Sequence, residues 1–228
     1  MDESLHDGHR QRLRERFLAE GIDSFQPHEV LEFLLFFGIP RKDTNELAHQ
    51  LIRTFGSLSE VLDAPYEELR RIKGMTAGAA VLLKTIPAAG RAYLLDRHAA
   101  PLVMDSPKAL GEYFVDRFFG ETAELVWLLC LDSSLNVIAC EQVARGTVTV
   151  AQAPARKIAE LTLRHNSSRV VLAHNHPRGM AIPSNEDIIS TRCLCACLRG
   201  IEIELVDHII VAGRDYVSLR NRYPSALE

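Results

Sequence analysis

The sequence predicts an α/β domain over residues 106–228, preceded by a small all-α domain over residues 1–98 and a linker at 99–105. Two observations lead to this fold class. After the linker, continuous apolar runs that are typical of buried strands alternate with segments of helical periodicity. Before the linker, every apolar stripe has helical spacing. We therefore expect a helical domain followed by a sheet with helices packed on its faces.

The clearest helix of the first domain covers residues 29–37. Its apolar side chains recur three and four positions apart until Gly38 and Pro40 end the pattern. Residues 43–55 repeat the pattern and stop at Gly56, a residue typical of helix ends. Shorter helices are expected at 7–17, 57–62, 65–72 and 77–95.

The second domain begins at Ser106-Pro107, a typical helix start because proline is tolerated in the first turn. The strongest strand prediction is 125–131, an unbroken apolar run. The remaining elements alternate along the chain. Further strands are expected at 136–144, 170–174, 202–211 and 216–219, and helices at 108–119, 154–165 and 184–198.

Composition limits the class of protein. With 228 residues, 47% of them hydrophobic, the chain can bury a substantial core, and its net charge of −4 gives no general attraction to nucleic acid. No apolar run approaches the roughly 20 residues that a membrane helix needs, and the N-terminus lacks a signal-peptide pattern. Five cysteines, an odd number in mostly apolar surroundings, suit reduced thiols. We expect a cytoplasmic globular protein that does not contact membrane.

A metal site is predicted where the strand at 170–174 ends. His174 and His176 are two positions apart, so their side chains can point to one side of the strand and meet one ion. Asp187, in the first turn of the next helix, can supply a third ligand. Two imidazoles and a carboxylate leave a fourth position open, as in catalytic zinc sites. The expected cofactor is Zn²⁺.

Two further residues complete the expected chemistry. Glu141 stands in an otherwise apolar strand, where a carboxylate needs a reason to be present, and it is the candidate general base. Ser184 could donate a hydrogen bond to a developing oxyanion. Plainer interpretations exist for each residue: a capping box for Ser184-x-x-Asp187, ordinary strand-end polarity for the histidines, and a solvated strand position for Glu141. No single one of these alternatives explains all five residues.

Glu141, His174-x-His176 and Ser184-x-x-Asp187 together resemble the JAMM motif of the MPN/JAB metalloprotease family. The tripeptide from His174, followed by proline, is similar to the RadC branch. The resemblance implies a cytidine-deaminase-like JAB/MPN sheet, zinc held by the two histidines and the aspartate, Glu141 as general base and Ser184 as oxyanion support.

The resemblance also implies a class of substrate and a biological process. It spans about residues 104–222 and implies cleavage of peptide or isopeptide bonds, so the expected partner is an unknown peptide or protein conjugate. The RadC branch is named for DNA repair. Where many RadC-like sequences have a serine after His-Asn-His-Pro, this chain has Arg178, which places a positive charge beside the site.

The first domain carries a motif similar to a helix-hairpin-helix around Gly74-Met75. Such hairpins offer backbone amides to a DNA phosphate, with basic residues nearby. Thr76 stands where the second glycine belongs, so the motif is degenerate, and a structural helical hairpin is the alternative. The candidate DNA-binding residues are Arg70, Arg71, Lys73, Gly74 and Lys84.

The sequence therefore favours a zinc-dependent hydrolase of the peptidase type. The alternative is a non-enzymatic DNA-associated factor that binds DNA through its helical domain. Asp207-His208, on a closing strand, could provide a partner for a ligand imidazole, although a strand pair with its own hydrogen bonds is an equally good interpretation.

Overall fold

The computed structural model describes residues 3–40, 42–98, 102–146 and 155–227. The chain divides into two compact units, Met1–Gly90 and Arg91–Glu228. The division falls within helix α6 (Ala77–Asp96), ahead of the linker that the sequence predicts at 99–105. Residues 99–101 of that linker lie outside the described residues.

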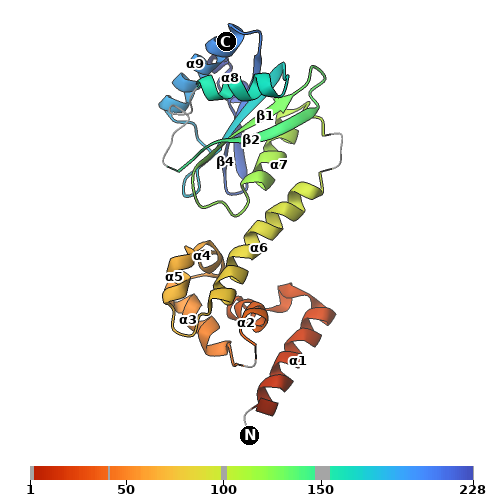
Figure 1. Cartoon of the computed structure of the whole chain (residues 1–228), viewed down its shortest axis with the longest axis vertical. Coiled ribbons are helices and arrows are strands. Elements are labelled where there is room, and N and C mark those ends of the chain that lie inside the picture. Colours follow the sequence, from red (N-terminus) through yellow and green to blue (C-terminus); the bar gives the residue numbers. More distant parts are fainter. Residues whose placement is uncertain (1–2, 41, 99–101, 147–154, 228) are drawn as a thin grey trace. The chain divides into compact units, whose positions relative to one another are not determined.

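The described part of the first unit is all-helical, as predicted (Figure 1). A cluster of buried aliphatic side chains holds the helices after α1 together, with Leu31, Leu35, Leu51, Leu69 and Leu83 fully buried. A capping box at Gln26 and Glu29 starts α2, and Gly56 ends α3 with a φ of +97°. The helices are α1 (Glu3–Glu20), η1 (Ile22–Ser24), α2 (Pro27–Gly38), α3 (Asn45–Phe55), α4 (Leu58–Asp63), α5 (Tyr66–Arg71) and the first part of α6.

The second unit contains a five-stranded mixed sheet in the order β2-β1-β3-β4-β5. Only β3 and β4 are parallel, and helix α9 makes the crossover between them. The strands are β1 (Leu125–Leu131), β2 (Val137–Arg145), β3 (Arg169–Asn175), β4 (Glu204–Ala212) and β5 (Asp215–Ser218). The helices are the end of α6, α7 (Pro107–Phe118), α8 (Ala155–Arg164), α9 (Asn185–Arg199), α10 (Leu219–Arg222) and η3 (Pro224–Ala226).

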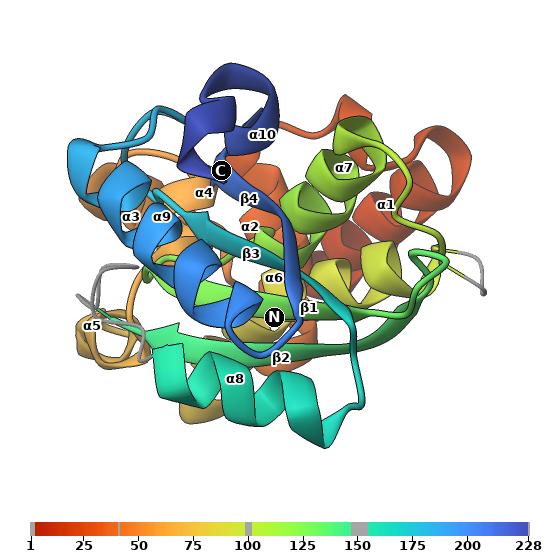
Figure 2. The same cartoon turned by 90° about the horizontal axis from the view of Figure 1, so that it is seen from above.

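Helices cover both faces of this sheet, so the predicted α/β class is confirmed (Figure 2). Helices α8 and α9 bury Ile158, Leu161 and Leu194 against one face. Helix α7 buries Tyr113 and Phe114 against the other face. Because both faces are covered, β1 is apolar along its whole length, LVWLLCL.

The sheet sets the position of the candidate metal ligands. His174 lies near the C-terminal end of β3, two residues after Leu172, so both side chains point to the face covered by α8 and α9. The chain then passes through His176 to the N-terminus of α9. No helix in the described part of the chain is long and apolar enough to span a bilayer.

Candidate metal centre

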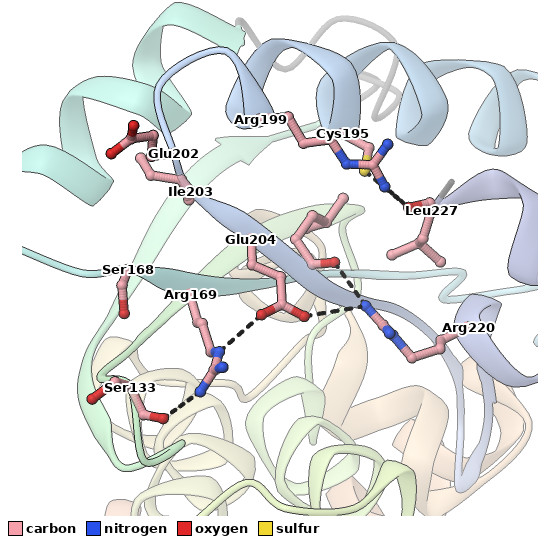
Figure 3. Close-up of a pocket in the computed structure, with 11 residues that line it drawn as sticks. Ser133, Ser168, Arg169, Cys195, Arg199, Glu202, Ile203, Glu204, Arg220 and Leu227 are labelled. Carbon is pink, nitrogen blue, oxygen red and sulfur yellow. Dashed lines mark hydrogen bonds and ion pairs between the residues drawn. The ribbon is translucent and has the colours of Figure 1, made fainter.

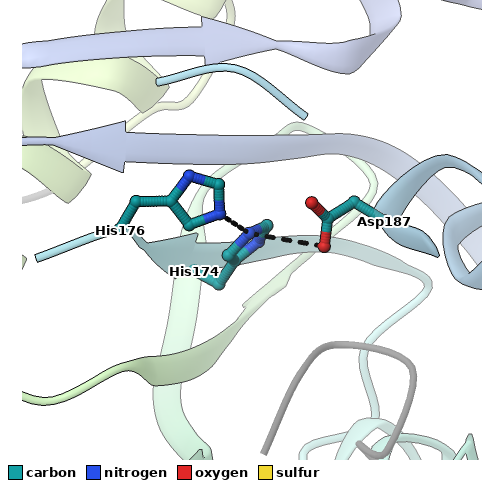
Figure 4. Close-up of side chains that lie close together, drawn as sticks. All are labelled: His174, His176 and Asp187. Carbon is teal, nitrogen blue, oxygen red and sulfur yellow. Dashed lines mark hydrogen bonds and ion pairs between the residues drawn. The ribbon is translucent and has the colours of Figure 1, made fainter. Parts of the chain in front are cut away.

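Three predicted ligands meet at the start of α9. Nε2 of His174 lies 3.0 Å from Nε2 of His176 and 3.5 Å from Oδ1 of Asp187. One ligand atom from each of the three residues lies within 4.8 Å of the others, and His174 and Asp187 are buried (Figure 4). The sequence prediction that these three side chains come together is therefore confirmed.

The two separations measured from His174 Nε2 are compatible with a tetrahedral zinc site. Zinc–nitrogen and zinc–oxygen bonds of about 2.0–2.1 Å, arranged tetrahedrally, place neighbouring ligand atoms about 3.3 Å apart. The separations of 3.0 and 3.5 Å bracket that value. Two imidazoles and one carboxylate are also donors that zinc accepts, and the set leaves a fourth position for a substrate or water.

The loop after β3 fixes which nitrogen of His176 faces this centre. The backbone carbonyl of Met180 lies 2.9 Å from His176 Nδ1, and a carbonyl can only accept a hydrogen bond. Nδ1 therefore carries a proton, so a ring with a single N–H presents its Nε2 lone pair toward His174 and Asp187. Gly179 packs closely under the ring, since a Cβ on this residue would lie 3.2 Å from His176 Cβ. An electron-rich nitrogen beside a carboxylate oxygen is favourable for a cation.

Burial determines the charge of the histidines. It lowers the pKa of His174 to about 4, with Asp187 opposing and His176 reinforcing the effect. Burial likewise holds the pKa of His208 well below its ordinary value. Both imidazoles are therefore neutral near pH 7.

Asp187 is held by the N-terminal cap of α9. Its Oδ2 accepts hydrogen bonds from the backbone N–H of Ser184 at 2.8 Å and from the Ser184 hydroxyl at 2.7 Å, while Oδ1 faces His174. The Ser184 oxygen in turn accepts from the Asp187 N–H at 3.1 Å. The capping box is thus confirmed, and it aims one carboxylate oxygen at the centre. The single proton of the Ser184 hydroxyl points to Asp187 in this arrangement.

Glu141 is not brought to this cluster. It lies on β2 opposite Leu128 of β1, which in turn lies opposite Leu172 of β3, so a whole strand separates Glu141 from the strand that carries His174. Adjacent strands are about 4.8 Å apart, which puts the Glu141 backbone about 10 Å across the sheet from β3. Its carboxylate accepts a hydrogen bond from Nε2 of His165, just after α8, at 2.9 Å. Its role as a base stays a prediction.

A cavity of about 580 Å³ adjoins the centre and gives access to His176. Arg178 and Glu124 are its charged lining residues, so the arginine that departs from the RadC-like pattern lines the same cavity as His176. The full lining is Thr122, Ala123, Glu124, Gly146, His176, Pro177, Arg178 and Gly179.

A larger cavity, about 720 Å³, lies at the opposite ends of β3 and β4 (Figure 3). Three arginines line it, but they are engaged within the protein. Arg169 and Arg220 both pair with Glu204, at 2.9 and 3.7 Å. Arg199 donates to the carbonyl of Leu227 at 2.7 Å. These contacts account for the charge of this cavity without a ligand.

Two buried residues, His208 and Thr191, are linked by hydrogen bonds to Nδ1 of His174, the ring nitrogen that does not face Asp187. Nε2 of His208 lies 2.8 Å from His174 Nδ1, so the possible partnership of the closing strand with a ligand imidazole is confirmed for His208. Asp207 serves another purpose, because it accepts hydrogen bonds from Ser218 and from the backbone of Arg220. Thr191, which contacts His208, was missed by the sequence analysis. Its position four residues after Asp187, on the same face of α9, was the available signal.

The candidate DNA-binding residues lie around the turn between α5 and α6. Gly74 has a φ of +91°, as a tight hairpin turn requires. Arg70 donates to the carbonyl of Met75, and Lys84 donates to the carbonyl of Leu62 at 2.7 Å, so both are used inside the unit. Among the residues described, Arg71 and Lys73 are exposed and make no hydrogen bond or ion pair.

Thr76, which replaces the second glycine of the hairpin motif, has a structural role. Its hydroxyl oxygen accepts a hydrogen bond from the N–H of Ala79 at 3.1 Å, which caps the start of α6. The hydroxyl also donates to the carbonyl of Gly38 at 3.2 Å. The departure from the motif therefore supplies a helix cap and a link to α2.

Both units match known protein families. Residues 104–223 match the RadC-like JAB domain, and residues 8–81 match the UPF0758 N-terminal domain. A UPF0758 protein of Cupriavidus taiwanensis is 34% identical over 92% of this chain and 92% of its own length. UPF0758 proteins of Ruegeria pomeroyi and Fusobacterium nucleatum are 35% and 32% identical, over 93% and 96% of this chain and 95% and 97% of their own lengths. The chain therefore belongs to the UPF0758 family of proteins with a RadC-like JAB domain.

Proposed function

We propose that this protein is a zinc-dependent hydrolase of the JAMM type that cleaves a peptide or isopeptide bond. The observation that carries the proposal is the convergence of ligand atoms of His174, His176 and Asp187, all within 4.8 Å of one another, beside a cavity that His176 lines. When bound, zinc supplies Lewis-acid activation of water and of a substrate carbonyl. Membership of the RadC-like JAB family supports a metallohydrolase.

Other residues orient the ligands and accept a proton. Ser184 holds Asp187 through two hydrogen bonds, and Met180 holds His176 through one, so the ligands are preorganised. We assign Glu141 the acceptance of the proton released when water attacks, on the basis of the family motif. In that role the carboxylate must leave His165 and turn toward the centre.

The test begins with the metal. The purified protein is stripped with a chelator, reloaded with zinc, and analysed for metal content. We expect one zinc per chain in the parent and loss of binding in His176→Ala. A correctly folded parent that binds no zinc would overturn the proposal.

Turnover is tested separately with libraries of peptides and of lysine-linked isopeptides. We expect hydrolysis by the zinc-loaded parent, and Glu141→Gln should retain zinc but lose at least about 100-fold in rate, the contribution typical of a general base. Glu160→Gln, which alters an exposed carboxylate on α8, is the matched control. A Glu141→Gln variant as fast as the parent would remove Glu141 as the base.

We also propose that the first unit binds DNA. The proposal rests on Arg71 and Lys73, which are exposed beside the Gly74 turn. Fluorescence anisotropy with double-stranded, single-stranded and branched DNA should show binding that weakens steeply with salt and is lost in the double variant Arg71→Gln, Lys73→Gln. No binding at low salt would eliminate it.

A further inference from the structure

A chain of buried hydrogen bonds runs from helix α9 to the candidate ligand His174. Thr191 and His208 are completely buried, and His174 is 6% exposed. Thr191 Oγ1 lies 2.6 Å from the backbone carbonyl oxygen of Asp187 and 2.6 Å from Nδ1 of His208. His208 Nε2 lies 2.8 Å from Nδ1 of His174. With so little solvent contact, the protein itself must set the direction of each hydrogen bond.

The direction of these hydrogen bonds follows from the backbone carbonyl of Asp187, because it is the one group in the series that cannot donate. The Asp187 carbonyl only accepts, so the single hydroxyl proton of Thr191 is directed to it. The Thr191 oxygen must then accept the third contact, which requires a proton on Nδ1 of His208.

The tautomer of His208 in turn determines that of His174. Among the described residues, the completely buried ring of His208 contacts a hydroxyl and an imidazole and no carboxylate that would balance a positive charge, so the ring carries one N–H. With Nδ1 protonated, Nε2 of His208 is an acceptor, and the 2.8 Å contact requires a proton on Nδ1 of His174. His174 Nε2 is then left with a lone pair that faces His176 and Asp187.

We propose that Thr191 and His208 are positioning residues that fix the tautomer of His174, so that its Nε2 is always the metal-binding nitrogen. This inference rests on the proposed metal site and deepens it. The two histidines then follow one rule: His176 is set directly by the carbonyl of Met180, and His174 is set by the carbonyl of Asp187 through two side chains. Asp187 thus has two roles in this proposal. Its carboxylate is a metal ligand, and its backbone carbonyl orients the hydroxyl of Thr191 and thereby sets the tautomer of His174.

The tautomers can be read by long-range ¹H–¹⁵N correlation NMR of the metal-free protein. The parent should show His174 and His208 as Nδ1–H tautomers. Thr191→Val keeps the side-chain shape but removes the acceptor for His208 Nδ1–H. We expect His208 to become the Nε2–H tautomer and drive His174 to the Nε2–H form, in which the ligand nitrogen is protonated. Thr191→Ser should restore the parent pattern.

Zinc affinity, measured by competition with a chromophoric chelator, supplies a second readout. Thr191→Val should bind zinc about 10–100-fold more weakly, the usual effect of losing a partner of a ligand imidazole, and Thr191→Ser should bind within a few-fold of the parent. Unchanged tautomers together with unchanged affinity in Thr191→Val would overturn the inference.

A second pair of variants covers the case in which Thr191→Val does not fold. The amide oxygen of His208→Gln can still accept from His174 Nδ1–H, whereas His208→Leu cannot. We expect the His174 tautomer to survive in the first and to become mixed in the second. If it is identical in both, the proposal fails. Neither readout uses hydrolysis, so a protein that cleaves nothing but shows these shifts would refute the proposed reaction and retain the inference.

Discussion

The two units bury polar side chains for different purposes. In the first unit Glu32 is almost fully buried, and its carboxylate accepts hydrogen bonds from His9 of α1 and Asn45 of α3, both at 2.9 Å. Each carboxylate oxygen has a partner, so the group links three helices and offers nothing further. In the second unit, the outer atoms of His174, His176 and Asp187 are held by hydrogen bonds, and one inner atom of each side chain faces those of the other two.

The difference shows how a structural polar cluster is distinguished from a binding site. Burying a polar group is costly unless it is paired, so a fold tends to satisfy every donor and acceptor. The Glu32 cluster does so. In the second cluster, hydrogen bonds hold the outer atoms of the three side chains, and the inner three atoms face one another where the proposed ion would bind. The orientation of these side chains is therefore a product of the surrounding hydrogen bonds.

The largest difference between the two clusters is expected when one carboxylate in each unit is replaced by an amide and zinc affinity is measured. Asp187→Asn should lower zinc affinity at least about 100-fold, because a neutral amide is a poor replacement for a charged ligand. Glu32→Gln, the matched change, should leave zinc affinity within about twofold of the parent. Isothermal titration of both metal-free variants with zinc measures this. Equal loss in the two variants would mean that zinc does not bind at the Asp187 centre.

The second prediction concerns stability of the first unit. Glu32→Leu removes the acceptor of the hydrogen bonds from His9 and Asn45, and each such bond contributes about 0.5–1.5 kcal/mol. Urea unfolding followed by circular dichroism should show this loss, while the Glu32→Gln variant, which retains one acceptor oxygen, should lose less. A Glu32→Leu variant as stable as the parent would show that the cluster does not hold the helices together.

The sequence predicted those parts of the site that depend on local spacing. His174 and His176 are two apart on a strand, and Asp187 lies in the first turn of the helix that follows, so the local elements determine their meeting. The longer helices and the five strands were predicted for the same reason, since their apolar periodicity is local. The short helices η1, α10 and η3 were not predicted. The C-terminal end of the strand expected at 216–219 differed by one residue, because Ser218 caps α10.

Side-chain contacts between residues far apart in the sequence could not be predicted from it. The side-chain contact of Glu141 depends on the packing of α8, which brings His165 to its carboxylate. Lys84 is a candidate DNA-binding residue in the sequence, but in the folded unit it donates to the carbonyl of Leu62, 22 residues earlier. Local spacing contains no information about either kind of contact.

A smaller effect is expected at the glycine that packs under His176. In Gly179→Ala the new Cβ would lie 3.2 Å from His176 Cβ, so the ring must shift by a few tenths of an ångström. Because catalytic and metal sites tolerate displacements of only about 0.5 Å, we expect a few-fold loss of zinc affinity. Gly78→Ala in α6, where the nearest atom lies 4.0 Å away, is the control and should have no effect on zinc. Unchanged affinity in Gly179→Ala would show that the ring position is not limiting.

The smallest expected effect is a difference in pH dependence between the units. The pKa of Glu29 is held below its ordinary value of 4.5, chiefly by the hydrogen bond from Arg16. Its contribution to stability is therefore present above pH 4.5 and is lost as the pH falls through the lowered pKa. Asp207 has the opposite sign, because burial raises its pKa above 3.8. The folded state takes up that proton first, so stability gains as the pH falls through the raised pKa.

Variants that remove each titration separate the two effects. The stability of the parent relative to Glu29→Gln should shrink between pH 6 and pH 3, whereas its stability relative to Asp207→Asn should grow over the same range. Urea midpoints at several pH values, with unfolding of each unit followed separately by hydrogen exchange, provide the measurement. The same sign in both variants would contradict the contrast, because it would mean that burial does not dominate at Asp207 or that Arg16 does not stabilise the Glu29 carboxylate.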